Sequence, residues 1–447
     1  MILLINPDSP PESPWGFSRM LPPLGLAYIA STIEKAGFPV SIYDNCLMRK
    51  SVSEIKNEVK RLNPEIVGIS CNSVNYEKCV EISKAVKDVD PNCKVVVGGP
   101  HPTYMFESVL EHREIDYAIV GEGEWAMLEL VKCIKQGANF RRISRIPGVA
   151  YKSGETFKMN PPKFIHNLDE IPLPARHLLQ MDMYDRKIEL LDVKPVDIMN
   201  VVRGCPFNCS FCETKEIWGH VSRYFSPSRI VEEIEHLMNA YGTKGVYFIG
   251  DNFTINKKVT REVCELLIKK ELDVEWICDT RVDLVSRDLL KIMREAGCRT
   301  IWFGVESGSP RILQKLNKGI NLNQAVKAFK LCKEVGIRTA CSFLLGIPGE
   351  KVEDMEATFR FARTLNPDWC QFNIFIAVPG SKLYDEVVQG NLYSHRDGFI
   401  TYVKTDDFDY QSLLKIQRNF HKRFNRAPNR VLRRMRRKFC AILKGSN

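Results

Sequence analysis

Short apolar runs alternate with amphipathic stretches along the first 140 residues. The runs are mostly continuous rather than alternating, which is typical of strands covered on both faces. They are MILLIN (1–6), PVSIYD (39–44), EIVGIS (65–70), KVVVGG (94–99) and YAIVGE (117–122). Helical patterns separate them, over 24–35, 52–62 and 76–88, briefly after Pro102, and from Glu124. Five βα units of this length predict a doubly wound, Rossmann-like parallel sheet.

The same alternation resumes after residue 195 and continues to about residue 377. The expected strands are DIMNVVR (197–203), GVYFIGD (245–251), VEWICDT (274–280), TIWFGVE (300–306), RTACSFLLGI (338–347) and WCQFNIFIA (369–377). Helical patterns cover about 226–240, 257–270, 286–295, 323–335 and 352–364. Six units are too few for a closed eight-stranded barrel, so we predict an open, partial (β/α)6 barrel.

The remaining stretches lack this regularity. Residues 141–195 include two prolines in HNLDEIPLPARHLL and predict an ordered connector. We therefore expect a first domain over 1–140, a connector over 141–195, a barrel over 196–380 and a small α-helical region over 381–447.

Composition narrows the class of protein. The chain has 447 residues, 44% hydrophobic and 26% charged, as an ordinary globular protein has. No apolar run reaches 18 residues and the start lacks a basic lead, so we expect a cytoplasmic protein without a signal peptide. The net charge of +10 comes from the end, because residues 411–447 hold twelve Lys or Arg and no acid.

Three of the fifteen cysteines are clustered, in RGCPFNCSFCE (203–213). Cys205, Cys209 and Cys212 form a C-x3-C-x2-C triplet in the loop after the first barrel strand, on the face where such barrels place their chemistry. A zinc ribbon needs a second ligand pair, although His220 could supply a fourth ligand. A thioredoxin-like Cys209–Cys212 pair leaves Cys205 without a role. Three thiolates on a 4Fe–4S cluster would leave one iron open to a chelating molecule.

The triplet, with Phe211 just before its last cysteine, resembles the radical S-adenosylmethionine superfamily. That resemblance implies that the open iron chelates S-adenosylmethionine, which is then cleaved to methionine and a 5′-deoxyadenosyl radical. The resemblance also assigns cofactor-binding roles to residues at four later strand ends. They are Gly250 and Asp251 in FIGDNFT for the methionine amino group, Arg281 in DTRVD for a bidentate grip on its carboxylate, Glu306 in FGVESGS for the ribose, and Gly346 and Ile347 in LLGIPGE beside the adenine.

The first sheet has a resemblance of its own, to the cobalamin-binding domain that precedes the barrel in one group of these enzymes. The alternative is a plain nucleotide-binding domain, but no G-x-G-x-x-G follows the first strand. Small residues would let backbone approach a large flat ligand. The candidate cofactor-binding residues are Gly25, Ser70, Gly98, Gly99, His101, Gly121 and Glu122.

One segment departs from the resemblance. Cobalamin domains that replace the lower axial base with histidine carry D-x-H-x-x-G, and the stretch here is DNCLMR (44–49). Cys46 takes the place of the histidine and Arg49 that of the glycine. We therefore expect base-off cobalamin with no protein histidine on cobalt, and a structural or tail-contacting role for His101.

The resemblance implies a cobalamin-dependent radical C-methyltransferase that acts on an unactivated carbon. The alternative is an enzyme of the same architecture that forms or contracts a ring without methyl transfer. A tRNA methylthiotransferase would need a further cysteine triplet, and a non-catalytic cobalamin sensor would have no use for the cysteine triplet, Arg281 and Glu306.

The expected partners are a small-molecule substrate and an external electron donor of the flavodoxin or ferredoxin type. Leu432, Met435, Phe439 and Ile442 mark an amphipathic basic helix over 431–443. This helix either packs on the barrel or contacts an anionic membrane, which would suit a lipid or isoprenoid-like substrate. Nucleic acid is not expected, because the tail has few aromatic residues for base stacking.

Overall fold

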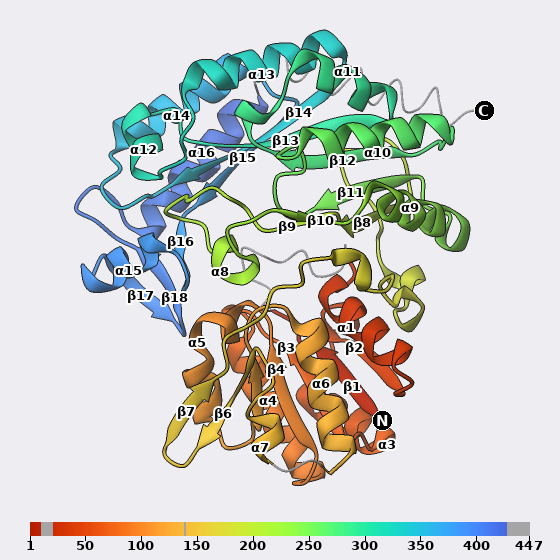
Figure 1. The fold of residues 1–447 in the computed structure, drawn as a ribbon. Coiled ribbons are helices and arrows are strands. Elements are labelled where there is room, and N and C mark those ends of the chain that lie inside the picture. Colours follow the sequence, from red (N-terminus) through yellow and green to blue (C-terminus); the bar gives the residue numbers. More distant parts are fainter. Residues whose placement is uncertain (10–20, 138–139, 427–447) are drawn as a thin grey trace.

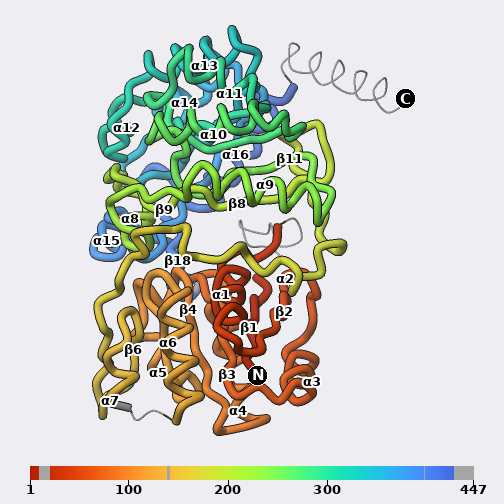
Figure 2. Tube along the Cα trace, turned by 45° about the vertical axis from the view of Figure 1, so that its right-hand side comes forward, coloured from red at the N-terminus to blue at the C-terminus, as the bar shows by residue number. Residues whose placement is uncertain are grey.

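The computed structural model describes residues 1–9, 21–137 and 140–426. Two sheets, one from each half of the chain, form the two bodies of the molecule, with the second above the first in Figure 1. Figure 2 shows the connector crossing between them. No helix among the described residues has the length and apolar character that a membrane span requires.

The first sheet has the doubly wound order predicted from the sequence. Its strand order is β2-β1-β3-β4-β5-β6-β7, and β1 to β5 are parallel. The strands are β1 (Ile2–Asn6), β2 (Val40–Asp44), β3 (Ile66–Ser70), β4 (Lys94–Gly98), β5 (Tyr117–Ile119), β6 (Val149–Ser153) and β7 (Thr156–Met159).

Helices cover both faces of this sheet. Ile2 and Leu4 pack under α1 and α6, whereas Leu3 and Ile5 pack against α3, α4 and α5, so both faces of β1 are buried. This explains the continuous apolar runs. The helices are α1 (Leu24–Lys35), α2 (Asn45–Met48), α3 (Val52–Leu62), α4 (Tyr76–Val89), α5 (Pro100–Glu111), α6 (Gly123–Lys135) and α7 (Phe140–Ile143).

The hairpin β6–β7 was not predicted. It lies in the stretch expected to be a connector, yet β6 pairs antiparallel with β5 and extends the first sheet. The rest of the connector carries three short 3-10 turns. They are η1 (Leu168–Glu170), η2 (Arg176–Leu178) and η3 (Met181–Met183).

The second sheet is the predicted six-stranded partial barrel. Its parallel strands lie in the order β15-β14-β13-β12-β11-β8, which follows the chain without a crossover. The strands are β8 (Val196–Asn200), β11 (Gly245–Ile249), β12 (Glu275–Thr280), β13 (Cys298–Glu306), β14 (Arg338–Leu345) and β15 (Trp369–Ile374).

Helices cover the outer face of the barrel and close the largest core (Figure 1). The predicted helices are present, and a turn and a further helix accompany them. These elements are α9 (Pro227–Tyr241), α10 (Lys257–Lys269), η4 (Val282–Leu284), α11 (Arg287–Glu295), α12 (Pro310–Lys315), α13 (Leu322–Val335) and α14 (Val352–Leu365).

The C-terminal region holds helices, as expected, and also a small antiparallel sheet in the order β16-β18-β17. The last described helix, α16, packs on β15. The elements are β16 (Ile376–Ala377), α15 (Lys382–Gln389), β17 (Tyr393–Asp397), β18 (Ile400–Val403) and α16 (Tyr410–Asn425). The predicted basic helix over 431–443 lies outside the described residues.

The carboxyl edges of the two sheets meet where α5 of the first body packs on the short helix α8 (Thr214–Trp218) of the second. The Tyr104 hydroxyl donates to the carbonyl of Glu213, 3.0 Å away, one residue after the cysteine triplet. The two edges that the sequence marks for ligands therefore lie against each other.

Candidate active site

A cavity opens at the carboxyl edge of the barrel and collects most of the predicted barrel residues. It is lined by the ends of β11, β12, β13 and β14 and by the loop that carries the triplet. The predicted residues in its lining are Cys205, Cys209, Phe211, Cys212, Gly250, Asp251, Arg281 and Glu306. The lining also includes Asn252, Asp279, Trp302, Lys318 and Tyr247, which the sequence analysis did not single out as site residues.

The cysteine loop spans residues 204–213, between the short strand β9 (Val202–Arg203) and α8. Gly204 has φ +90°, and a Cβ there would lie 2.3 Å from the carbonyl oxygen of Val221, so only glycine fits. Its N–H donates to Asp251 Oδ2 at 2.6 Å. Ser210 donates from its N–H to the carbonyl of Leu316 at 2.9 Å and from its hydroxyl to that of Lys315 at 2.8 Å. These bonds hold the loop on the barrel mouth.

The three thiols line one cavity, as the ligands of a shared cluster would. In a cluster each thiolate binds its own iron. His220, the alternative fourth zinc ligand, is exposed and absent from the lining. The donor set therefore fits a cluster held by three thiolates.

Burial makes the thiols of Cys205 and Cys209 hard to ionise in the free protein. Desolvation raises the pKa of Cys205 to about 11 and also raises that of Cys209, although Lys318 and Arg281 oppose the rise at Cys209. Because metal ligands must be thiolates, a bound metal supplies the positive charge that ionisation needs. Asn252 Nδ2 lies 3.5 Å from Cys205 Sγ and donates to it.

Arg281 has fewer donors available than the sequence suggested. Its Nε and Nη2 both donate to the Asp283 carboxylate at 3.0 Å, and its guanidinium lies 3.7 Å from the centre of the Phe207 ring. Only Nη1, which is buried, has no partner. The bidentate fork that we predicted for a ligand carboxylate is therefore occupied by Asp283, and one N–H group remains for an anion.

Glu306 forms a buried ion pair that the sequence did not reveal. Lys318 Nζ donates to Glu306 Oε1 at 2.9 Å and lies 5.7 Å from the centre of the Phe211 ring. Burial alone would lower the pKa of Lys318, but Glu306 and Cys209 raise it above its ordinary value. Lys318 follows α12 in a stretch (LNKG) without a motif, so only the fold brings it to the cavity.

Two carboxyl groups in the cavity are shifted toward the neutral form. Desolvation raises the pKa of Asp251 to about 6 and that of Asp279 to about 7. The Tyr247 hydroxyl donates to both oxygens of Asp279, at 2.9 and 2.8 Å, and partly offsets this rise. Asp279 and Asn252 lie within DTRVD and FIGDNFT, so the strand-end signal could have found them.

Gly346 and Ile347 do not line the cavity. Both donate their N–H groups to Glu350 Oε2, at 2.6 and 3.1 Å, and Ile347 is buried in the barrel core. Gly346 has φ +86°, and a Cβ there would meet the side chain of Leu413 at 2.5 Å. In this structure the segment LLGIPGE closes its own turn.

The small residues of the first sheet form two groups. Gly99 (φ +118°) and Gly121 (φ +78°) serve the fold, since a Cβ at Gly99 would lie 2.6 Å from the Cys71 carbonyl oxygen and one at Gly121 3.1 Å from Pro162. Gly25 faces open space, and Ser70 and Gly98 are half-buried at the ends of β3 and β4. No large side chain stands at these last three positions, so the edge fits a broad, flat ligand.

His101 and Glu122 are both engaged within the protein. His101 Nδ1 lies 3.1 Å from the Ser73 hydroxyl, and its ring packs between Tyr76 and Phe399, at 4.5 and 4.7 Å. Burial lowers its pKa to about 4, and its Nε2 has no partner. Both oxygens of Glu122 accept from arginines of the barrel.

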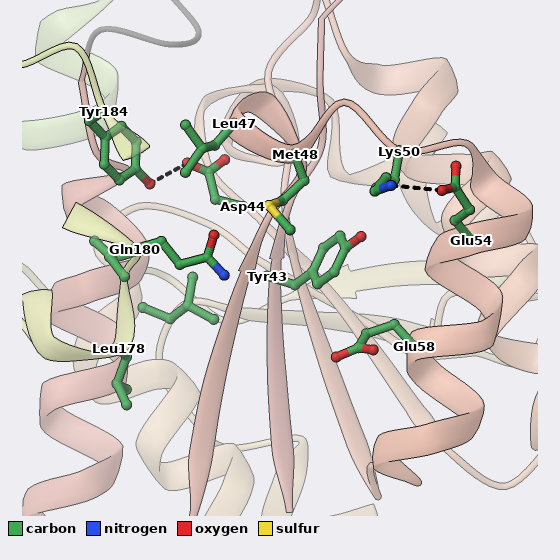
Figure 3. A pocket seen from close by; sticks show the side chains of 12 residues that line it. Tyr43, Asp44, Leu47, Met48, Lys50, Glu54, Glu58, Leu178, Gln180 and Tyr184 are labelled. Carbon is green, nitrogen blue, oxygen red and sulfur yellow. Dashed lines mark hydrogen bonds and ion pairs between the residues drawn. The ribbon is translucent and has the colours of Figure 1, made fainter. Parts of the chain in front are cut away.

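The segment DNCLMR begins at the carboxyl end of the edge strand β2, and Figure 3 shows its Asp44 bonded to Tyr184. Asp44 accepts from Tyr184 at 2.5 Å, and the Cys46 thiol donates to the carbonyl of Pro7 at 3.0 Å. Leu47 and Met48 line a separate cavity beside the edge strand β2, and Cys46 does not. Three strand spacings, about 14 Å, separate β2 from β4. The structure therefore does not bring Cys46 to Gly98.

Two family models match the chain. The model of the radical SAM superfamily matches residues 199–362, and that of the B12 binding domain matches residues 18–131. Together these domains imply a 4Fe–4S cluster, S-adenosylmethionine and cobalamin.

Two curated relatives and one solved structure are similar over most of the chain. An uncharacterized methyltransferase of Pyrococcus horikoshii is 38% identical over 83% of this chain and 79% of its own. An anaerobic magnesium-protoporphyrin IX monomethyl ester cyclase of Rubrivivax gelatinosus is 32% identical over 82% of this chain and 66% of its own. The radical S-adenosylmethionine methyltransferase TsrM of Kitasatospora setae shares the fold, with a TM-score of 0.73 at 18% identity over 89% of this chain and 77% of its own.

Proposed function

The chain belongs to the radical S-adenosylmethionine enzymes that carry a cobalamin-binding domain, and we propose from this premise that it is a C-methyltransferase. Its substrate is a small molecule with an unactivated carbon, and an external donor of the flavodoxin or ferredoxin type supplies the electrons. The relative of Pyrococcus horikoshii, which carries the name methyltransferase, supports this choice.

One observation carries the proposal. The cavity with the three thiols opens at the edge of the barrel that packs on the glycine-rich edge of the first sheet, where Tyr104 bonds to the residue after Cys212. When bound, an open-iron cluster supplies an electron to a chelated sulfonium, and cobalamin supplies a carrier for a methyl group. A methyl transfer that uses both groups requires their edges to be adjacent, as they are in this fold.

The chain's own residues would hold and orient these groups. Cys205, Cys209 and Cys212 hold the cluster, and the free Nη1 of Arg281 binds the carboxylate of S-adenosylmethionine. Glu306 keeps one oxygen for the ribose while Lys318 fixes the other.

We further propose that cobalamin binds base-off with no protein histidine on cobalt. Cys46 is bonded to Pro7. His101 is fully buried against aromatic rings, so its unpartnered Nε2 is enclosed by the protein, which supports a cobalt without a protein histidine. Electron-spin resonance of the Co(II) form should show no nitrogen superhyperfine splitting. A splitting that changes with 15N-labelled histidine would refute this proposal.

The basic tail favours a lipid or isoprenoid-like substrate. We propose a cytoplasmic enzyme that contacts the membrane peripherally through this tail. We assign residues 1–140 to cobalamin, 196–380 to radical chemistry, 141–195 to the connector and 381–447 to the C-terminal region. Flotation with anionic vesicles should depend on residues 428–447, and equal flotation of the truncated protein would refute membrane contact.

The decisive experiment follows the two products of S-adenosylmethionine. With reductant, both cofactors and an extract of candidate substrates, the enzyme should form 5′-deoxyadenosine and S-adenosylhomocysteine together. The cyclase relative supports a second candidate, a ring-forming enzyme without methyl transfer. That enzyme would form 5′-deoxyadenosine without S-adenosylhomocysteine.

A further inference from the structure

A buried network of ion pairs ties the cysteine loop to the first domain. Glu122 and Glu124 lie where α6 begins, directly after the carboxyl end of β5. Arg203 donates from Nη1 to Glu122 at 2.8 Å and from Nη2 to Glu124 at 2.5 Å. Arg223 donates from Nη1 to the other oxygen of Glu122, at 2.7 Å. Two guanidinium groups of the barrel thus neutralise two carboxylates of the first domain.

The two arginines flank residues 204–222, the segment that begins with the cysteine loop. Arg203 ends β9, and Arg223 begins β10 (Arg223–Tyr224), which pairs with β9 so that Arg203 and Arg223 face each other. The segment between them, residues 204–222, contains all three cysteines. The base of this segment is therefore tied at both ends to Glu122, and at Arg203 also to Glu124.

Aromatic rings from both bodies enclose the Arg203 guanidinium. It lies 5.5 Å from the centre of the Tyr28 ring, on α1 of the first domain. It lies 4.8 Å from the centre of the Trp218 ring, inside the cysteine segment. The side chains of Arg203, Glu122 and Glu124 are at most 5% exposed, so water does not screen these contacts.

Such a network costs desolvation and is weak evidence for stability by itself. Its geometry is specific, because Arg203 bridges Glu122 and Glu124 through two different nitrogens while Arg223 binds the other oxygen of Glu122. We propose that Arg203, Arg223, Glu122 and Glu124 are positioning residues that set the distance between the cysteine loop and the ligand edge of the first domain.

The consequence for catalysis rests on the proposed function. Cleavage of S-adenosylmethionine at the cluster needs only the barrel, whereas methylation of cobalamin needs both domains in register. A small displacement of reacting groups costs about 100-fold in rate. Loss of the network should therefore affect the two half-reactions unequally.

The test compares Arg203→Met with Arg186→Met. Arg186 is a matched control because it forms another buried ion pair, in which its Nη2 lies 2.6 Å from Asp197 Oδ2. Asp197 lies near the start of the barrel strand β8, at the end away from the cysteine loop. Glu122→Gln is a milder variant that keeps an acceptor, in case Arg203→Met does not fold. All three are prepared as the full chain, without cofactors for the first readout and with reconstituted iron and sulfide for the second.

The first readout is amide hydrogen exchange of the cofactor-free protein. Arg203→Met should speed exchange within residues 204–222 by about tenfold, and Arg186→Met should leave this segment unchanged. Unchanged exchange in both Arg203→Met and Glu122→Gln would overturn the proposal. This readout does not depend on which reaction the enzyme performs.

The second readout uses S-adenosylmethionine, hydroxocobalamin and a reductant without substrate. In Arg203→Met, cobalamin-dependent formation of S-adenosylhomocysteine should fall about 100-fold while 5′-deoxyadenosine falls less than about threefold. An equal fall of both products, or the same pattern in Arg186→Met, would overturn the proposal. If the wild-type protein forms no S-adenosylhomocysteine, the methyltransferase function fails, and the exchange result alone decides on the network.

Discussion

The barrel mouth and the glycine-rich edge of the first sheet are both carboxyl edges of parallel strands, yet they are built differently. The mouth consists of polar side chains in a buried cavity, with an unpartnered nitrogen on Arg281 and a raised pKa on Asp279. The other edge consists mainly of backbone, with Gly99 pressed on Cys71 and open space at Gly25. On our proposal, one edge recognises its ligand through functional groups, and the other through shape.

The largest expected effect separates the two edges completely. Cys209→Ser should abolish iron binding and formation of 5′-deoxyadenosine, because a serine hydroxyl does not replace a thiolate ligand. Cobalamin binding to the first domain should stay at the wild-type level. Iron analysis and a visible-light titration with hydroxocobalamin measure the two properties.

The control for this prediction is Cys332→Ala, which removes a buried thiol of α13 in the barrel core. It should retain its iron. A Cys209→Ser protein that keeps a full iron complement, or that loses cobalamin binding as well, would contradict the division of labour between the edges.

The next effect divides the glycine edge itself. Gly99→Ala should destabilise the first domain by about 1–3 kcal/mol, because alanine does not tolerate φ +118° and its Cβ would meet Cys71. Gly25→Leu should change stability by less than about 0.5 kcal/mol, since no atom of the described residues lies within 4 Å of a Cβ built there, and should still weaken cobalamin binding.

Urea unfolding and cobalamin titration of both variants decide this point. Cobalamin binding of Gly25→Leu at the wild-type affinity would remove Gly25 from the ligand edge. Unaltered stability of Gly99→Ala would show that the turn can relax around an added Cβ.

The smallest expected effect concerns the buried charge at the mouth. Asp279 has its pKa raised from 3.8 to about 7 by desolvation, so the folded protein binds this proton more tightly than the unfolded chain. The resulting stabilisation is complete below about pH 4 and is lost as the pH rises through 7. The side chain of the Asp279→Asn variant does not titrate. Its free energy of unfolding, relative to that of wild type, should therefore rise by about 2 kcal/mol between pH 5 and pH 8.

Urea unfolding of the cluster-free barrel at several pH values measures this gain. Tyr247→Phe removes the hydroxyl that favours the charged carboxylate and should extend the loss of stability to higher pH, because the pKa of Asp279 rises further. Parallel stability curves for wild type and Asp279→Asn would contradict a raised pKa.

The regular parts of the fold were predictable because each carries a local pattern. Continuous apolar runs marked β1 and β3, and the 3.6-residue period marked the helices. The hairpin β6–β7 and the small sheet with β17 and β18 were missed, because their strands are short and their pairing is decided by a distant neighbour. β6, for example, adds to the edge that β5 leaves open.

The candidate site likewise has residues that a local pattern predicted and contacts that only the fold creates. Cys205, Cys209 and Cys212 are close in sequence, and their spacing alone pointed to the chemistry. Lys318 lies in no motif. It pairs with Glu306 only because the loop after α12 folds over the mouth of the barrel. The ion pair between Arg281 and Asp283 was equally unpredictable, because a sequence does not show which nitrogens of an arginine remain without a partner.

The sequence by itself determined the two parallel sheets, the strand ends that carry chemistry and the three thiols, because these follow from local periodicity and spacing. The tertiary structure decided which polar groups meet. Glu122 lies 81 residues from Arg203 and 101 from Arg223, and no local signal links them. The fold buries these charges away from water, and a buried charge is unfavourable unless it is paired with an opposite one. The partners therefore come from the two sides of the domain boundary.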